Sequence, residues 1–203
     1  MNEHLRSIAG EKADRMSELW RNKQIEYTFR RGLMREYEDF GVCTRQALLF
    51  AACALEVDLS EEDQEKLIEE YQNLRPFPDV IPGIKALKRE GRVLVAFSNG
   101  VEATARTLLS RAGVLPHLHG VVSVDDLKTF KPDPEVYRYL ARYLERMPYE
   151  TWVVSSNPFD VIGAKSAGLG AIWLKRKPDA QFDPWEIEPD LVAPDLETLA
   201  EKL

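Results

Sequence analysis

The second half of the chain alternates short apolar runs with amphipathic segments, and this alternation limits the possible folds more than any other feature. The apolar runs, rich in β-branched and aromatic residues, cover 93–98, 120–124, 151–156 and 171–174. The segments between them have helical spacing, at about 101–112, 134–146 and 160–167. Short apolar runs joined by helical crossovers are typical of a parallel sheet with helices on both faces. We therefore predict an α/β fold with a Rossmann-like parallel sheet.

The first third of the chain has a helical pattern instead. Apolar residues recur every three or four positions from Asp14 to about Asp39, which predicts one long helix or two abutting ones. Thr44 and Ser60 are residue types that cap helices, so two further helices are expected over 44–57 and 60–74. Two prolines after Arg75 cannot continue a helix. The predicted organisation is a helical unit, residues 1–77, followed by an α/β core, residues 78–203.

Composition narrows the class of protein. Of 203 residues, 44% are apolar and 30% are charged, so we expect a globular chain rather than a disordered or fibrous one. No apolar run approaches the roughly 20 residues of a membrane-spanning helix, and the residues after Met1 lack the apolar stretch of a secretory signal. The net charge of −7 disfavours a nucleic acid or an anionic membrane as a partner.

Two cysteines bear on the cellular compartment. Cys43 and Cys53 lie on one helical pattern and are interpreted as buried thiols. Their separation along a helix is too large for a disulfide within it. Because nothing favours an oxidising compartment, we expect a cytoplasmic protein.

Polar residues follow the predicted strands, where ligands of open α/β sheets bind. Ser98-Asn99-Gly100 follows the first run and Asp125-Asp126 the second, Lys131-Pro132-Asp133 lies in the next crossover, and 155–160 (SSNPFD) ends the third. Each short segment alone is better explained as a turn or a helix start. Their joint placement at the strand ends predicts a functional site.

The acids and histidines near these strand ends do not favour a metal site. A magnesium ion needs several oxygen ligands, usually with more than one carboxylate, and Asp160 is the only acid in 155–160. His117 and His119 have no carboxylate or third ligand beside them and are expected at the surface. We therefore expect no metal and no other cofactor.

The order strand–SNG, KPD, strand–SSNxxD resembles the haloacid dehalogenase superfamily, and more narrowly its type II L-2-haloacid dehalogenases. The helical part agrees, because SELWRNKQIEYTFRRGLM (17–34) resembles the first cap helix of that family. KPDPEVY (131–137) and VVSSNPFDVIGAKSAGLGAIWLKR (153–176) resemble its later motifs. The resemblance implies a helical cap on an α/β core. It also implies metal-independent displacement of halide from a short (S)-2-haloacid through an aspartyl ester, which water then hydrolyses.

The resemblance also implies roles for particular residues. Arg21 would receive the halide with help from Asn157, Ser98 and Asn99 would hold carboxylates, and Lys131 would orient the nucleophile and pair with Asp160, which prepares the hydrolytic water. Tyr137 and Ser155 would complete the polar surroundings, and Ile25, Phe40 and Phe159 would form an apolar wall. The family usually has Trp at the position of Phe159 and Gln at that of Asn22, a further substrate-binding candidate, so substrate size stays open. Core packing is an equally good explanation of the three apolar residues.

One family element has no counterpart in the sequence. The superfamily begins with a strand ending in Asp-x-x-x-Thr, whose first Asp is the nucleophile, and the early acids Glu3, Glu11 and Asp14 follow no apolar strand. Three accounts remain open: such a strand precedes Met1, the chain is an inactive relative that pairs with a second chain, or it is a magnesium-dependent phosphatase. We expect the core to lack its first strand, so that 93–98 and 151–156 flank an opening.

The resemblance and the apolar density of the second predicted helix point to self-association. The family often forms homodimers through cap helices, and LLFAACAL (48–55) is more apolar than a thin helical layer can bury. A homodimer is expected, with a small 2-haloacid as the other partner.

Overall fold

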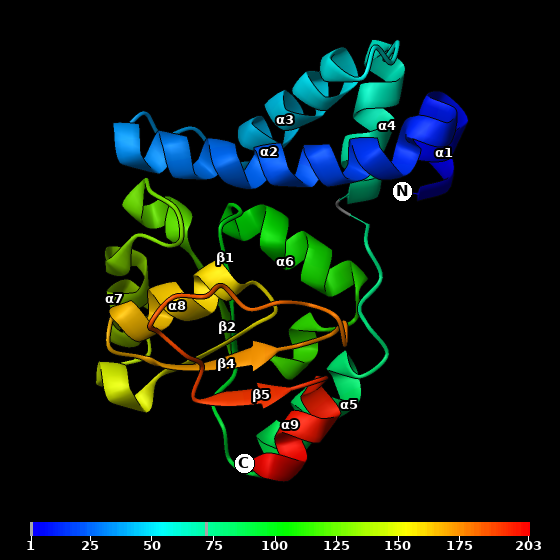
Figure 1. The fold of residues 1–203 in the computed structure, drawn as a ribbon. Coiled ribbons are helices and arrows are strands. Elements are labelled where there is room, and N and C mark those ends of the chain that lie inside the picture. The colour runs from blue at the N-terminus through cyan, green and yellow to red at the C-terminus, as the bar shows by residue number, and fades with distance from the viewer. Residues whose placement is uncertain (1, 72) are drawn as a thin grey trace.

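The computed structural model describes residues 2–71 and 73–203. It places a layer of helices over one end of an α/β core (Figure 1). Met1 and Gln72, which fall within the predicted 1–77 unit, lie outside the described residues. Among the described residues, no helix combines the length and apolarity needed to cross a membrane.

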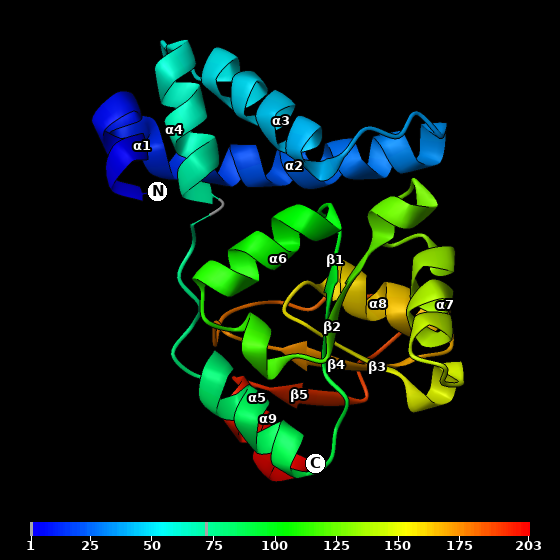
Figure 2. The same ribbon diagram turned by 180° about the vertical axis from the view of Figure 1, so that it is seen from behind.

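The helical layer consists of α1 (Asn2–Ala9), α2 (Ala13–Met34), α3 (Phe40–Ala54) and α4 (Glu61–Tyr71). Its own apolar core contains the fully buried side chains of Met16, Leu48 and Leu67. The long α2 runs across the width of the core below it (Figure 1). Helix α3 lies on the side of α2 that faces away from the core, and α4 crosses beside α2 and runs down toward the core (Figure 2). One chain segment, residues 73–79, leads from this layer into the core.

Two predicted helix boundaries in this layer are wrong. Helix α2 ends at Met34 rather than near Asp39, because Arg35 takes the left-handed conformation with φ of 58° and its N–H closes the last turn. Helix α3 begins at Phe40, where the Asp39 side chain accepts a hydrogen bond from the backbone N–H of Val42. Thr44 therefore lies inside α3. The cap predicted at Ser60 is confirmed, since its hydroxyl accepts from the N–H of Asp63.

The core follows the predicted alternation of helices and strands. Its elements are α5 (Val80–Arg89), β1 (Val95–Ser98), α6 (Glu102–Arg111), β2 (Gly120–Ser123), α7 (Pro134–Tyr143), β3 (Trp152–Ser155), α8 (Pro158–Ser166), β4 (Gly170–Leu174), β5 (Leu191–Ala193) and α9 (Leu196–Lys202). Every predicted strand and crossover helix is present, with ends that differ by a few residues. The short strand β5 was not predicted from the sequence.

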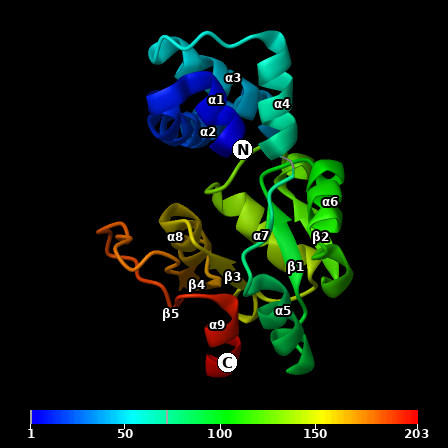
Figure 3. The same ribbon diagram turned by 90° about the vertical axis from the view of Figure 1, so that its right-hand side faces the viewer.

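The strand pairs that the structure describes in the core are parallel, as predicted, and they are divided into two sheets. One sheet has the order β1-β2, with Val95 opposite Gly120 and Ser98 opposite Ser123. The other has the order β3-β4-β5. In Figure 3 the sheet with β1 and β2 lies on the right of the core, and the sheet with β3, β4 and β5 lies to its left.

The predicted opening between the first and third apolar runs is confirmed. A cavity of about 1070 Å³ is lined by both β1 and β3, the two strands that face each other across the gap. Apolar side chains from α5, α7 and α9 also line it, among them Ile84, Leu140 and Leu199. The backbone N–H and C=O groups along one side of β1 and of β3 therefore border a space of mostly apolar character.

The two cysteines differ from each other in burial. Both are free thiols, and Cys43 is buried as predicted. Cys53 is exposed and does not belong to the buried residues of α3. The prediction of two buried thiols is therefore wrong for Cys53.

Candidate active site

The carboxyl ends of the core strands meet beneath the helical layer and enclose the upper part of the cavity. Three strands end in serine at this edge: Ser98 on β1, Ser123 on β2 and Ser155 on β3. The cavity is lined here by Ser98 and Ser155, and by residues of α2 and α3 from above. The site predicted at the strand ends thus lies between core and helical layer.

A buried cation and carboxylate form the centre of this site. Lys131 and Asp160 are 7% and 5% exposed, and the Nζ of Lys131 lies 3.1 Å from Oδ2 of Asp160. The other carboxylate oxygen accepts a hydrogen bond of 2.9 Å from the hydroxyl of Tyr137. Both oxygens of Asp160 are therefore bound to donors, which orients the carboxylate and compensates for its loss of water.

Lys131 is also fixed to the end of β1. Its Nζ donates to the backbone carbonyl of Phe97 at 3.1 Å and lies 3.9 Å from the centre of the Phe97 ring. Its backbone N–H donates to the side chain of Asn99. An ammonium group has three N–H donors, and among the described residues two of them have partners. One donor is thus left for an acceptor in the cavity.

Tyr137 supports Asp160 from behind. It is fully buried and does not line the cavity, and its hydroxyl reaches the site through Asp160. Its expected place in the polar surroundings of the substrate stays a prediction. Burial raises the pKa of the Tyr137 phenol above its ordinary value, and the negative charge of Asp160 adds to this effect. The phenol therefore stays protonated and donates to the carboxylate.

The serines that end β1 and β3 each accept a hydrogen bond from the backbone N–H two residues later in the chain. Ser98 accepts from the N–H of Gly100, and Ser155 accepts from the N–H of Asn157 at 3.2 Å. Asn157 precedes Pro158, the first residue of α8, which carries Asp160 on its first turn. Ser98, Asn99, Ser155, Asn157 and Asp160 all line the cavity, so the structure brings these predicted residues together.

The helical layer contributes a second cation. Arg21 on α2 lines the cavity, and its Nη2 lies 3.4 Å from Oδ1 of Asn157 on the core. Ile25 and Thr28 follow on the same face of α2 and also line the cavity. Thr28, 1% exposed, was missed from the sequence, although its spacing of seven residues from Arg21 gives it this face.

Apolar side chains form part of the cavity wall, as predicted. Ile25 and Phe40 line it from the helical layer and Phe159 from the core. The ring of Phe159 packs edge-on against that of Phe29 on α2, with centres 5.2 Å apart. Asn22 is exposed and is not among the residues that line the cavity, so its role as a substrate contact stays a prediction.

A second contact between layer and core lies beside the cavity. The hydroxyl of Tyr37, in the loop after α2, donates a hydrogen bond of 2.6 Å to Asp125 just after β2. Its ring packs on Phe130, with centres 4.9 Å apart, and Lys128 pairs with Asp125. Burial raises the pKa of the Tyr37 phenol, and the Tyr37 hydrogen bond lowers that of Asp125. The contact fixes the loop that carries Lys131 to the loop that leads into Phe40.

The side chains around the cavity do not favour a metal site. Among the described residues, no group of three or more His, Cys, Asp or Glu side chains is placed to hold a metal ion. His119 accepts from the backbone N–H of Leu94 through Nδ1 and is exposed. Its contact thus joins the segment that precedes β2 to the residue that precedes β1.

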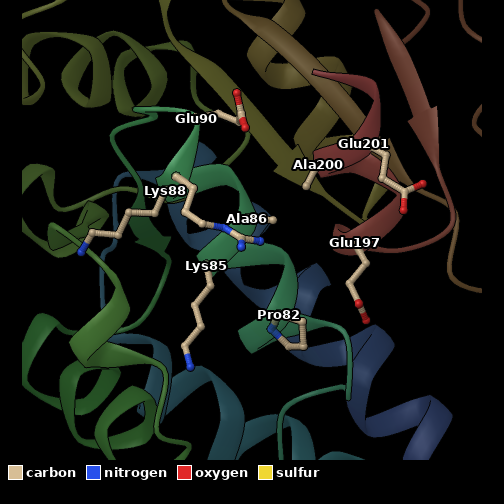
Figure 4. A pocket seen from close by; sticks show the side chains of 9 residues that line it. Pro82, Lys85, Ala86, Lys88, Glu90, Glu197, Ala200 and Glu201 are labelled. Atoms are coloured by element: carbon tan, nitrogen blue, oxygen red, sulfur yellow. The ribbon is translucent and has the colours of Figure 1, made fainter.

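A second hollow of about 870 Å³ lies at the opposite end of the core, between α5 and α9. It is lined by charged side chains, including Lys85 and Lys88 from α5 and Glu197 and Glu201 from α9. In Figure 4 the long side chains of these residues diverge and do not meet over the hollow. The site at the strand ends is therefore the better candidate.

Comparisons with known proteins agree with this placement. Residues 5–168 match the family model described as haloacid dehalogenase-like hydrolase. Haloacetate dehalogenase H-2 of Moraxella sp. (strain B) is 34% identical over 184 residues, which cover 91% of this chain and 82% of that protein. (S)-2-haloacid dehalogenase 4A of Burkholderia cepacia is 33% identical over 178 residues, 86% of this chain and 77% of that protein.

A solved structure has the same fold. L-2-haloacid dehalogenase from Xanthobacter autotrophicus superposes with a TM-score of 0.91 at 27% identity, covering 98% of this chain and 90% of that one. The matched family region includes α2 with Arg21, the loop with Lys131 and helix α8 with Asp160. The chain belongs to the haloacid dehalogenase-like hydrolase family.

Proposed function

We propose that the protein hydrolyses the carbon–halogen bond of short (S)-2-haloacids, such as (S)-2-chloropropionate, to give (R)-2-hydroxy acids without a metal. One observation carries the proposal: two cations, Arg21 from above and Lys131 from below, border a cavity with a largely apolar wall. An anionic substrate with a polarisable carbon–halogen bond fits such surroundings. The named relatives, two of them at 33–34% identity, support the same reaction class.

The first step is a displacement at C2. A carboxylate oxygen attacks C2 from the side opposite the halogen, and the electron pair of the carbon–halogen bond leaves with the halide. An ester forms, and the configuration at C2 inverts. Arg21 and the side-chain amide of Asn157 lie 3.4 Å apart at the cavity, where together they offer N–H donors to the departing halide.

The second step hydrolyses the ester. Water attacks the carbonyl carbon of the ester, which frees the 2-hydroxy acid and regenerates the carboxylate. Asp160 accepts the proton of this water, because it is the carboxylate at the strand ends and each of its oxygens retains an acceptor site beyond its bond to Lys131 or Tyr137. Lys131 orients the nucleophile with its remaining N–H donor.

The nucleophile itself is proposed to arrive with a strand that fills the opening between β1 and β3. Among the described residues, the cavity is lined by two carboxylates, Asp160 and Glu150. Glu150 lies at the amino end of β3, remote from Lys131, and its side chain accepts from the N–H of Met147. A strand between β1 and β3, parallel to both, would end next to Lys131 and there present an acid.

A magnesium-dependent phosphatase is less well supported. Such an enzyme needs several oxygen ligands around the ion, and the carboxylate of Asp160 is already bound by the Lys131 ammonium. A resident cation at that distance would repel the metal ion. The cations Arg21 and Lys131 would instead attract a carboxylate substrate and a halide product.

Chloride binding tests the proposed halide site in the chain as it stands. Arg21→Met should lower chloride affinity at least about tenfold, because the guanidinium supplies the charge that holds the anion. The line width of the chloride NMR signal, titrated with bromide as competitor, measures this affinity. Equal binding by the wild-type protein and Arg21→Met would refute the assignment of the halide to Arg21.

We also propose that α1–α4 act as a cap and that two copies of the chain associate through it. Leu49 and Phe50 on α3 are 43% and 39% exposed, and Leu33 and Met34 at the end of α2 are more exposed still. Light scattering at tens of micromolar should give the molar mass of a dimer. Leu49→Lys with Phe50→Lys should give a folded monomer, and a wild-type monomer would refute this proposal.

A cytoplasmic location is proposed because both cysteines are free thiols. Cys43 and Cys53 remain unpaired, one of them exposed, as is usual in reducing compartments. Fractionation of cells that produce the native protein would test the location.

A further inference from the structure

Arg21 is held by amide groups alone. Its Nη1 donates to Oε1 of Gln24, one helical turn along α2, at 3.0 Å, and its Nη2 reaches Asn157. No carboxylate of the described residues lies within ion-pair distance of its guanidinium, whereas Arg30 on the same helix pairs with Glu26. Arg21 thus keeps its full positive charge beside the cavity.

Gln24 is a polar side chain buried on α2 beside the site. It is 1% exposed, although a glutamine on a helix is usually at the surface. Its Nε2 donates to Oγ1 of Thr44 at 2.7 Å, and its Oε1 accepts from Arg21 and, at 3.2 Å, from Tyr71. The amide therefore joins α2, α3 and α4 at one buried point, and its burial is compensated by three hydrogen bonds.

The orientation of this amide follows from its neighbours. Thr44 has one hydroxyl proton, which it donates to the carbonyl of Phe40 at 2.6 Å. It must then accept from Gln24, so the NH₂ group faces Thr44 and the carbonyl oxygen faces Arg21. The reverse orientation would set two donor groups against the guanidinium and leave Thr44 without a donor.

Through Thr44, the same amide reaches the apolar wall. The hydroxyl of Thr44 holds the first turn of α3, and that turn begins with Phe40, which lines the cavity. One chain of hydrogen bonds thus runs from Arg21 through Gln24 and Thr44 to the backbone of Phe40. A displacement of Gln24 would move a charged group and an apolar group of the site together.

We propose that Gln24 is a positioning residue that holds Arg21 over the cavity without neutralising it. The proposal rests on the halide-binding role given to Arg21 above. A glutamate at position 24 would also accept from Arg21, but its charge would form an ion pair and cancel much of the attraction for an anion. A neutral acceptor fixes the geometry and leaves the charge for the halide.

The test compares chloride affinity in four variants of the full chain. Gln24→Glu, which keeps the shape and adds a charge, should lower the affinity about tenfold, close to the effect of Arg21→Met. Gln24→Met, which keeps the length but removes the hydrogen bonds, should lower it by a smaller factor, about threefold. Arg21→Met with Gln24→Glu together should bind no more weakly than Arg21→Met alone, because Gln24 acts through Arg21.

The chain offers a matched control on the same helical layer. Gln46 accepts from Nη2 of Arg31 at 3.1 Å, but this pair is exposed and outside the cavity. Gln46→Glu should leave chloride affinity unchanged. Circular dichroism melts of all variants show which of them are folded, and Gln24→Met keeps the test available if the buried charge of Gln24→Glu prevents folding.

The possible outcomes separate the two proposals. If Arg21→Met weakens chloride binding but folded Gln24→Glu and Gln24→Met bind like wild type, the role of Gln24 is overturned and the halide site stands. If Arg21→Met also binds like wild type, the halide site itself is wrong, and the inference about Gln24 fails with it. An additive double variant would show that Gln24 acts apart from Arg21 and would overturn its positioning role.

Discussion

A strand that ends in Asp-x-x-x-Thr, fused by a short linker ahead of Met1, should turn an inactive chain into one that releases chloride from (S)-2-chloropropionate. The 203-residue chain alone should show no release, because among the described residues that line the cavity the carboxylate near Lys131 is Asp160. Asp160 is assigned to the activation of water, so no second carboxylate is left there to attack C2. The fused strand would occupy the opening between β1 and β3 and bring a free carboxylate to Lys131. Chloride release and the configuration of the product, (R)-lactate, measure the gain.

The structure suggests why the strand should fit. The opening has backbone hydrogen-bonding groups on both sides, since β1 pairs with β2 and β3 with β4 at their other edges. The apolar wall would bury the side chains of a strand about as long as the four residues of β1 and β3. Filling the opening should therefore also raise the midpoint of urea unfolding.

A matched fusion separates folding from chemistry. The same strand with Asn in place of its Asp should raise the unfolding midpoint equally but release no chloride, since an amide is a poor nucleophile. Release that requires added magnesium, or turnover by the 203-residue chain itself, would refute the proposed mechanism. A fused strand that changes neither stability nor turnover would show that the opening does not accept it.

Local features of the sequence predicted most of the fold. The runs at 93–98, 120–124, 151–156 and 171–174 all became strands, because short β-branched runs between helices carry a strong local signal. The strand β5, only three residues long, gave too little signal to be recognised. The start of α3 was misplaced because Asp39 and Thr44 are both good caps. In the structure Asp39 accepts from the N–H of Val42, and Thr44 donates to the carbonyl of Phe40 inside the helix.

The site was predictable where its residues follow strands, and not where distant segments meet. Ser98, Lys131 and Asp160 lie where the strand ends placed them. The contact of Tyr37 with Asp125 joins residues 88 positions apart and has no local pattern. Asn22 was chosen from family resemblance alone, and its contact with substrate stays a prediction. Gln24 was missed because a single glutamine on a helix gives no sign of being buried.

Loss of the ammonium group of Lys131 should abolish turnover and cost much of the stability of the core. Lys131→Met keeps the aliphatic stem against Phe97 and leaves Asp160, 5% exposed, without its cation. Removing one partner of a buried ion pair typically costs about 3–5 kcal/mol. Urea unfolding of the 203-residue chain measures this cost.

An exposed lysine–aspartate pair in the same loop provides the control. The side chain of Lys128 is 63% exposed and pairs with Asp125 at 2.9 Å. Lys128→Met should cost no more than about 1 kcal/mol, because water screens exposed pairs. Equal unfolding midpoints for the two variants would contradict the importance of the buried pair.

A charge-neutral double variant then separates stability from catalysis. Lys131→Met with Asp160→Asn removes the unpaired charge and should recover most of the stability lost in Lys131→Met. In the protein that carries the fused strand, turnover should stay absent in both variants, because neither the orienting cation nor the base for water remains in the double variant. If Lys131→Met is unstable yet active, Lys131 serves the fold alone. If the double variant recovers stability but has no activity, the Lys131–Asp160 pair is needed for the chemistry.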